Sequence, residues 1–372
     1  MHKRPTEAHI DLRALEHNYL ELRGVAPETA LMAVVKANAY GHGAVEVAKR
    51  LEALGCPFFG VAIPEEGAEL RGAGITGPIA VLGGIFADQA PDIVELGLTP
   101  VVFDMTAAKA LDRAAKGRGM TLNIHVKVDT GMGRLGIQPA DATLFFNELK
   151  GLGNLRVESL ITHFAESESA DKKFSREQLS AFHRTAEAIK NAGADPGSLE
   201  TANSAALVDF APSRLDMARP GIMLYGSYPD ARLRAKVLLK PVMTLKTRIL
   251  HLKEVPAGFT VSYSRRFTAK KPSVIATLPI GYADGVPRSL GNTGEALVGG
   301  MRAPYAGTVC MDLLMLDVTG IPGVRQGDEA VLIGTQGNET ITAEEIAEKA
   351  GTISYEIFCR ISGRVPRIYT RC

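Results

Sequence analysis

About the first 240 residues of the chain alternate short apolar, β-branched runs with amphipathic stretches of helical periodicity. The short runs are LMAVVK (31–36), FFGVAI (58–63), PIAVLG (78–83), PVVFD (100–104), NIHVKVD (123–129), VESLITHF (157–164), SLETAN (198–203) and DMARPGIML (216–224). The helical runs between them include 44–55, 87–97, 106–117 and 174–193, and Gly or Pro ends most segments. About eight strand–helix units fit a closed (β/α)₈ barrel better than an open doubly wound sheet. We therefore expect an α/β protein built on a TIM barrel.

The pattern changes after about residue 240. The runs at 244–252, 273–281, 301–310, 313–319 and 329–335 are typical of strands, whereas TAEEIAEKAG (342–351) is a single strong helical run. A chain of 372 residues, 46% of them hydrophobic, is long enough for about two domains. We expect a barrel domain over 1–238 and a mostly β C-terminal domain over 239–372.

Charge and cysteine content argue against several classes of protein. The formal net charge of +1 gives no electrostatic reason to expect nucleic acid or an anionic membrane as a partner. The N-terminal stretch MHKRPTEAHI lacks the apolar core of a signal peptide, and no apolar run reaches transmembrane length. The cysteines, Cys56, Cys310, Cys359 and Cys372, form no C-x-x-C pair and are expected to be reduced thiols. The sequence thus favours a cytoplasmic protein and predicts no metal site.

A glycine-rich stretch, KVDTGMGRLG (127–136), contains the G-x-G-x-x-G spacing of dinucleotide-binding sites. That motif works when the glycines open a helix, but Pro139 suggests that the next helix begins after them. The expected acidic residue, Glu158, lies inside a strand run and not at its end. A nucleotide site is therefore the weaker alternative, and Arg134, held in a glycine loop beyond a strand, is the more informative residue.

Reactive groups in TIM barrels lie at the C-terminal ends of the strands. The polar residues at or near those ends are Lys36, Lys127, Arg134, His163, Ser204 and Arg219. Together they predict a cationic pocket for an anionic ligand. The loops after the seventh and eighth strands form a common phosphate site in barrels, and here we expect Ser204 to cap a helix and Gly221 to allow close backbone approach. The alternative is that these loops contain only a helix cap and a turn.

Lys36 ends the apolar run LMAVV. Burial among apolar neighbours lowers the pKa of an ammonium group and favours the neutral, nucleophilic amine. Such an amine can form a Schiff base with an aldehyde cofactor. The alternative is a lysine whose side chain extends out of the barrel mouth into solvent.

Motifs from both parts of the chain together resemble the alanine racemase family. They are AVVKANAYGHG (33–43), HVKVDTGMGRLG (125–136), THFA (162–165), TANSAA (201–206), ARPGIMLYG (218–226), VSYSRRF (261–267), GYADG (281–285), AGTVCMDLLMLD (306–317) and ISYEIFCRISGRVPR (353–367). The resemblance spans essentially the whole chain. It implies a pyridoxal-phosphate enzyme with a barrel and a β domain, in which the glycine loop positions Arg134 and binds no dinucleotide.

The resemblance also implies a role for each matching residue. Lys36 would carry pyridoxal phosphate as a Schiff base. The phosphate would be bound by Tyr40, Ser204, Gly221, Ile222 and Tyr355, and Arg219 would face the pyridine nitrogen. His163 is expected on the cofactor side of the site, where it would also support the second catalytic base. The substrate carboxylate would be held by Arg134 and the Met311 N–H, with Tyr282 and Asp312 lining the entrance. Lys127 matches a lysine that is carbamylated in some family members.

The implied reaction interconverts L- and D-alanine with two opposed acid/base groups, Lys36 and Tyr263. A free phenol has a pKa of about 10, so Tyr263 needs nearby positive charge or hydrogen bonding to act at neutral pH. Arg219 cannot accept a proton and would leave the pyridine nitrogen unprotonated, which favours reprotonation at Cα over transamination. The family further implies a head-to-tail homodimer whose sites borrow Tyr263 and Met311 from the partner, and D-alanine supply for peptidoglycan.

The sequence departs from the family pattern after Tyr263, where Gly, a variable residue and Thr are replaced by Ser264, Arg265 and Arg266. Serine lacks glycine's tolerance of positive φ. The family pattern therefore does not determine the loop conformation or the substrate range at this point. A racemase of another small amino acid, such as serine, is therefore one alternative. A basic-amino-acid decarboxylase is disfavoured by Arg219, since those enzymes place an acidic residue at the pyridine nitrogen. A non-catalytic pyridoxal-phosphate carrier is disfavoured by the second domain.

Overall fold

A computed structural model describes residues 4–370 of the chain. Eight parallel strands close into a barrel, in which the first strand pairs with the last. They are β2 (Ala30–Val34), β3 (Phe58–Val61), β4 (Ile79–Val81), β5 (Thr99–Val102), β6 (Leu122–Lys127), β7 (Leu155–Ile161), β8 (Ser198–Asn203) and β9 (Met217–Arg219). Each apolar run of the first half overlaps one of these strands, which confirms the predicted barrel.

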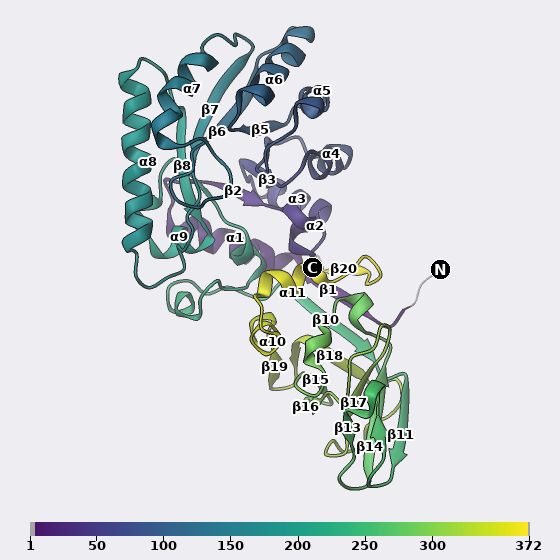
Figure 1. The fold of residues 1–372 in the computed structure, drawn as a ribbon. Helices are drawn as coiled ribbons and strands as arrows, with labels where there is room; N and C mark the ends of the chain where they lie inside the picture. The colour runs from purple at the N-terminus through teal and green to yellow at the C-terminus, as the bar shows by residue number, and fades with distance from the viewer. Residues whose placement is uncertain (1–3, 371–372) are drawn as a thin grey trace.

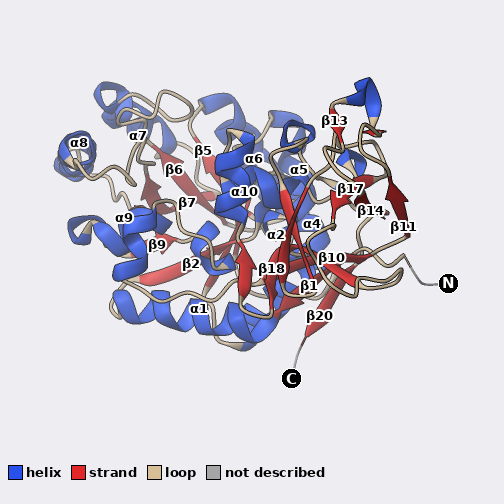
Figure 2. Cartoon of the chain, turned by 90° about the horizontal axis from the view of Figure 1, so that it is seen from below, coloured by secondary structure: helices blue, strands red, loops and turns tan. Residues whose placement is uncertain are grey.

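Helices surround the barrel strands, as Figure 2 shows. They are α1 (Leu12–Val25), α2 (Lys36–Tyr40), α3 (Ala44–Ala53), α4 (Pro64–Gly72), α5 (Ala90–Glu95), α6 (Met105–Gly117), α7 (Ala142–Leu149), α8 (Lys173–Asn191) and α9 (Ser204–Asp209). Side-chain caps fix several starts: Asp11 accepts N–H bonds at α1, and Asp104 does so at α6. A 3₁₀ turn at Pro139–Asp141 leads into α7, so the helix does begin beyond the glycine loop.

The C-terminal part is mostly β, as predicted. A seven-stranded sheet has the order β16-β15-β18-β10-β1-β20, with β19 paired to β18. Its strands are β1 (Glu7–Asp11), β10 (Met243–Arg248), β15 (Glu295–Val298), β16 (Met301–Pro304), β18 (Glu329–Gln336), β19 (Glu339–Ile341) and β20 (Arg367–Thr370). Two smaller sheets contain β11 (His251–Val255), β14 (Ser273–Leu278) and β17 (Leu314–Asp317), and β12 (Thr260–Val261) and β13 (Phe267–Thr268).

The N-terminal strand β1 lies in the C-terminal sheet and outside the barrel. It pairs antiparallel with β10 and parallel with β20, so both ends of the described chain meet in one sheet. Its alternating burial is that of a strand with one face on a core, but five residues carry no information about such distant partners. The sequence did not predict this strand, and the division at residue 238 remains a prediction.

Two helices of the C-terminal part connect it to the barrel (Figure 1). Helix α10 (Ala343–Ala350) was predicted and is capped by Thr342, whereas α11 (Ser354–Arg360) was not predicted. Helix α11 packs against α2, directly beyond the first barrel strand. The C-terminal part therefore contributes side chains to the mouth of the barrel. None of the helices within residues 4–370 has both the length and the apolar character needed to span a membrane.

Candidate active site

A cavity of about 420 Å³ opens at the C-terminal ends of the barrel strands. Ten of the predicted site residues line it: Lys36, Tyr40, Lys127, Arg134, His163, Ser204, Arg219, Gly221, Ile222 and Tyr355. Nine come from the barrel part and Tyr355 from α11. The predicted cationic pocket is therefore present, at the end of the barrel where the sequence placed it.

Lys36 begins a left-handed turn. Residues 37–40 all have φ between 51° and 54°, a conformation that costs L-residues about 1–2 kcal/mol each. Two backbone bonds maintain the turn, from Ala39 N–H to the Val35 carbonyl (2.8 Å) and from Gly41 N–H to the Ala37 carbonyl (2.9 Å). Burial and the nearby charge of Arg134 lower the pKa of the half-buried Lys36 ammonium, which favours its neutral form.

Several side chains hold this turn from outside. Glu66 of α4 accepts the Ala37 N–H at 2.6 Å, and the guanidinium of Arg367 donates to the Gly41 carbonyl at 2.9 Å. The buried His42 Nδ1 lies 2.9 Å from the Tyr40 carbonyl oxygen. Burial lowers the pKa of His42 to about 4, so its imidazole is neutral and can donate from Nδ1. The sequence did not predict Glu66 or Arg367, because no motif marks a residue that acts on a distant backbone.

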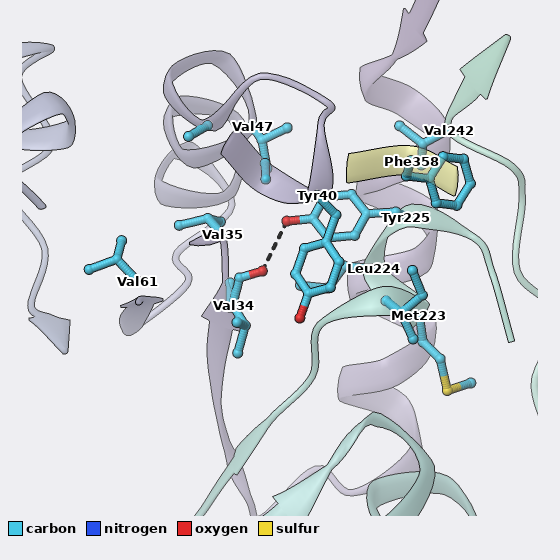
Figure 3. Packing of buried hydrophobic residues seen from close by; sticks show 14 of the residues in the cluster. Val34, Val35, Tyr40, Val47, Val61, Met223, Leu224, Tyr225, Val242 and Phe358 are labelled. Carbon is cyan, nitrogen blue, oxygen red and sulfur yellow. Dashed lines mark hydrogen bonds between the residues drawn. The ribbon is translucent and has the colours of Figure 1, made fainter. Parts of the chain in front are cut away.

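Aromatic packing completes the environment of the turn (Figure 3). The Tyr40 and Tyr225 rings lie 5.1 Å apart, and the Tyr225 hydroxyl donates to the Val34 carbonyl at 2.9 Å. The Tyr40 ring also lies 5.9 Å from that of Tyr355. Burial raises the pKa of Tyr40 well above its ordinary value, so this hydroxyl stays protonated and can donate to an anion.

The glycine loop of 127–136 wraps around the carboxylate of Asp129. Its Oδ1 accepts the N–H groups of Gly131, Met132 and Gly133, and its Oδ2 accepts that of Arg134 at 3.0 Å. Burial raises the pKa of Asp129, but these backbone donors outweigh it and hold the pKa below its usual value. The glycines thus shape a support for Arg134 and open no helix, which removes the geometry that the dinucleotide alternative needed. Asp129 itself was missed, although an Asp before a Gly-rich turn is a recognisable signal.

Positive charge dominates the cavity wall. Burial, Arg219 and Arg134 together lower the pKa of Lys127 to about 8. Burial, followed by the charges of Arg219 and Lys127, holds the pKa of His163 well below 6.5. A neutral imidazole and a partly neutral amine therefore line a pocket that also contains two permanently charged guanidinium groups and the Glu168 carboxylate.

Arg219 is fixed from behind by buried acceptors. Its Nη1 lies 3.1 Å from Glu200 Oε2, and its Nη2 donates to the Thr162 carbonyl at 2.5 Å. Glu200 is 0% exposed, and its other oxygen lies 3.5 Å from His125 Nδ1 inside the barrel. The sequence did not identify Glu200 or His125, because the apolar pattern of their strands gives no sign of an internal ion pair.

The loops after β8 and β9 approach each other closely. The Gly221 N–H donates to Ser204 Oγ at 2.8 Å, and a Cβ on Gly221 would lie 2.4 Å from the Tyr40 hydroxyl. Only glycine fits here without displacing Tyr40. One expectation was wrong: the helix cap is Asn203, whose side chain accepts the Ala206 N–H, and Ser204 is already inside α9. The Ser204 hydroxyl is therefore engaged with Gly221 at the cavity.

Four predicted site residues do not line this cavity. Tyr263, Tyr282 and Met311 are 69%, 37% and 53% exposed, and Asp312 is exposed beside Arg364, its carboxylate 2.7 Å from Nη2. They lie on loops of the small sheets, whose strands β13, β14 and β17 are far from the barrel in Figure 1. Within one chain, the structure does not bring the second proposed base to Lys36.

The backbone around Tyr263 is in the left-handed region on both sides. Ser262 has φ 70°, Ser264 φ 58° and Arg265 φ 52°. The position at which the family pattern has glycine thus adopts a positive φ here with serine, at some conformational cost. Ser262 Oγ donates to the Thr308 carbonyl at 2.6 Å, which holds the loop beside Cys310 and Met311.

Comparison with known proteins gives matches over both parts of the chain. The model of the alanine racemase N-terminal domain matches residues 10–229, and that of the alanine racemase C-terminal domain matches 242–369. The alanine racemase of Halothermothrix orenii is 48% identical over 367 residues, which cover 98% of this chain and 97% of that protein. The alanine racemase of Geobacter sulfurreducens is 46% identical over 374 residues, which cover 99% and 98%.

Solved structures agree with these matches. The alanine racemase of D-cycloserine-producing Streptomyces lavendulae superimposes with a TM-score of 0.95 at 37% identity, covering 100% of this chain and 98% of that one. The alanine racemase of Bacillus anthracis with bound L-Ala-P gives a TM-score of 0.94 at 36% identity, covering 100% and 96%. The likeness therefore extends to the arrangement of both domains.

Proposed function

The chain belongs to the alanine racemase family, and from this membership we infer that it is an isomerase that interconverts L- and D-alanine. The observation that supports this most strongly is the full-length similarity combined with a cavity lined by ten residues of the expected site. Chiral analysis of alanine after incubation with the pyridoxal-phosphate-loaded chain tests it. D-alanine formed from L-alanine is the expected product.

The cavity residues fit pyridoxal phosphate. Lys36 offers an amine of lowered pKa for covalent attachment to the aldehyde. The Ser204–Gly221 contact and the Tyr40 hydroxyl form a cradle without room for a side chain, which suits a phosphate beside Ile222 and Tyr355. Arg219, which also lines the cavity, would face the pyridine nitrogen. When bound, the cofactor acidifies the substrate Cα–H by delocalising the electrons left by the departing proton.

We propose that Lys36 and Tyr263 move the Cα proton on opposite faces of the substrate. The lowered pKa of the Lys36 amine favours its neutral form, which can accept a proton. Tyr263 would donate or accept on the other face, supported by the neutral imidazole of His163. Arg219 carries its proton permanently and is held by Glu200, so it contributes fixed charge and no proton transfer.

Arg134 would hold the substrate carboxylate, and Lys127 would steady Arg134 from behind. Because the pKa of Lys127 is lowered to about 8, a fraction of its amine is neutral at physiological pH. A neutral amine can bind carbon dioxide, losing a proton and gaining a carboxylate. The resulting negative charge would offset the neighbouring guanidinium groups and would favour a modified lysine at this buried position.

A second copy of the chain would complete each site. Tyr263 and Met311 are exposed in one chain and outside its cavity, with Tyr282 and Asp312 nearby at the proposed substrate entrance. We propose a head-to-tail homodimer in which the partner contributes these residues. Mixing inactive Lys36→Ala chains with inactive Tyr263→Ala chains should restore activity, since a mixed dimer has one site with both bases intact. Continued inactivity of verified mixed dimers would contradict the shared site.

Serine racemisation is the second candidate, and the left-handed Ser264 beside Tyr263 is the observation that favours it. Measuring the turnover of a panel of L-amino acids distinguishes alanine racemisation from serine racemisation. Faster conversion of serine than of alanine would make serine racemisation the first candidate. The proposed setting is the cytoplasm, where D-alanine would supply peptidoglycan synthesis. The expected partners are the small-molecule substrate and a second copy of the chain.

A further inference from the structure

Glu66 is the acidic side chain most closely connected with Lys36. Its Oε1 accepts the N–H of Ala37, the residue directly after Lys36, at 2.6 Å. Its Oε2 accepts the N–H of Ala62, just beyond the neighbouring barrel strand β3, at 2.7 Å. One carboxylate therefore ties together the ends of β2 and β3, using both of its oxygens on backbone donors.

The location of Glu66 makes this contact rigid. It lies in the first turn of α4, which starts at Pro64 after an extended Ile63. The turn that it holds consists of four consecutive non-glycine residues, 37–40, at positive φ. Such a backbone persists only where surrounding contacts determine it, and Glu66 supplies one at the residue directly after Lys36.

Glu66 also opposes the effect of the cationic groups on the charge of Lys36. Arg134 lowers the pKa of Lys36 and the Lys36 charge acts in turn on Lys127, whereas Glu66 and the Cys359 thiol act in the opposite direction. Arg219 adds a further permanent positive charge to the cavity wall. The Glu168 carboxylate also lines the cavity, but Glu66, just outside the lining, is the acidic residue that offsets the effect of Arg134 on Lys36.

We propose that Glu66 is a positioning residue for Lys36, which aims the amine into the cavity through the Ala37 N–H and balances the cationic wall around it. The inference rests on the proposed role of Lys36. It adds a residue that touches neither substrate nor cofactor and acts through the backbone of the reactive lysine.

The test measures covalent attachment of pyridoxal phosphate to the full chain freed of cofactor, across a pH series. Samples are quenched with borohydride at timed intervals, and the labelled peptide containing Lys36 is quantified by mass spectrometry. The parent chain gives the reference rate of attachment and the pH at which that rate is half of its maximum, the pH midpoint. Failure of the parent to be labelled at Lys36 would contradict the proposed function itself, separately from the role of Glu66.

Glu66→Gln removes the charge and turns an amide donor towards one of the two backbone N–H groups. We expect attachment about tenfold slower at its optimal pH. We also expect the midpoint to move to lower pH by about half a unit to one unit, because Lys36 loses its anionic neighbour. A merely structural role would lower the rate without moving the midpoint, and an unchanged midpoint in a folded Glu66→Gln chain would overturn the proposal.

Two further variants keep the test decisive. Glu65→Gln makes the same change of charge at the exposed neighbour on α4 and should leave both rate and midpoint at parent values. An equal shift in that control would show a general effect of charge and contradict a specific role. Glu66→Asp keeps the negative charge but shortens the side chain, which weakens its contact with the Ala37 N–H. The cofactor should therefore attach to this variant slowly, with the same pH midpoint as in the parent. If Glu66→Gln does not fold, parent-like attachment in Glu66→Asp would overturn the proposal.

Discussion

Arg219 and Glu200 form a buried ion pair across two adjacent barrel strands, with Nη1 3.1 Å from Oε2. Glu200 is fully inaccessible and Arg219 is only 6% exposed where it lines the cavity, so the pair is largely shielded from bulk water. Removing one member of a buried pair leaves an uncompensated charge, which is far more costly than losing a surface pair. The pair fixes the guanidinium at the cavity and keeps its charge constant.

Glu200→Gln should lower the free energy of unfolding by roughly 3 kcal/mol, because the Arg219 charge remains buried without a counterion. Chemical denaturation followed by circular dichroism measures the change. Glu158→Gln is the matched control: it also alters a carboxylate beside His125, but this one is 30% exposed. The control should lose much less stability. Equal losses would show that the pair with Arg219 has no special weight.

Gly221→Ala should weaken pyridoxal-phosphate binding by about tenfold or more, because the new Cβ meets the Tyr40 hydroxyl at 2.4 Å. Equilibrium dialysis with visible absorbance of the bound cofactor provides the measurement. Gly153→Ala serves as control, since nothing lies within 4 Å of its Cβ position. If Gly221→Ala bound pyridoxal phosphate with unchanged affinity, the proposed phosphate position beside Gly221 would be wrong.

His42 should make the fold sensitive to acid. Burial lowers its pKa from 6.5 to about 4, so the folded protein binds this proton less readily than the unfolded chain. Its contribution to stability is therefore complete above about pH 6.5 and is lost as pH falls towards 4, by roughly 3 kcal/mol in total.

His42→Asn retains a side-chain donor for the turn but cannot take up the proton. Its free energy of unfolding should fall less steeply than that of the parent between pH 6.5 and pH 4, as urea titrations across this range would show. His251→Asn, at an exposed position, should keep the parent slope. If the free energy of unfolding fell equally steeply with pH in the parent and in His42→Asn, His42 would not be the source of the acid sensitivity.

The two proposed bases should fail in different ways when removed. Lys36→Ala should lose both covalent attachment of the cofactor and proton abstraction from D-alanine. Tyr263→Ala should keep a coloured, bound cofactor and lose abstraction from L-alanine by about 10²–10⁴-fold. Residual exchange of the D-alanine Cα proton can survive in that variant, because Lys36 remains. Racemisation of L-alanine by Tyr263→Ala at nearly the parent rate would contradict the role of Tyr263 as the second base. His163 would then be the first candidate for that role.

The barrel could be predicted because each buried parallel strand appears in the sequence as a short apolar run. Cavity residues at strand ends, such as Lys36 and Arg219, followed from the rule that strand ends carry the chemistry, whereas Tyr40, Ile222 and Tyr355 came from the family resemblance. The left-handed turn over 37–40 could not be predicted, because no glycine stands within it and local preference opposes its conformation.

The carboxylates behind the site were missed for a different reason. Glu66 and Glu200 act on backbone or guanidinium groups that become neighbours only after folding, whereas Asp129 acts on the turn directly after it and was missed despite a local signal. Similarly, the pairing of β1 with β20 joins opposite ends of the chain, and no local pattern specifies it. Tyr263 was identified by family resemblance alone, and its place in a working site depends on a second chain.

Incubation of the pyridoxal-phosphate-loaded chain with L-alanine in deuterium oxide tests the central claim most directly. Chiral chromatography with mass spectrometry then reports both configuration and deuterium content. The account predicts D-alanine that carries solvent deuterium at Cα, with the two enantiomers approaching equal amounts. Absence of D-alanine from a chain that has bound its cofactor at Lys36 would contradict it.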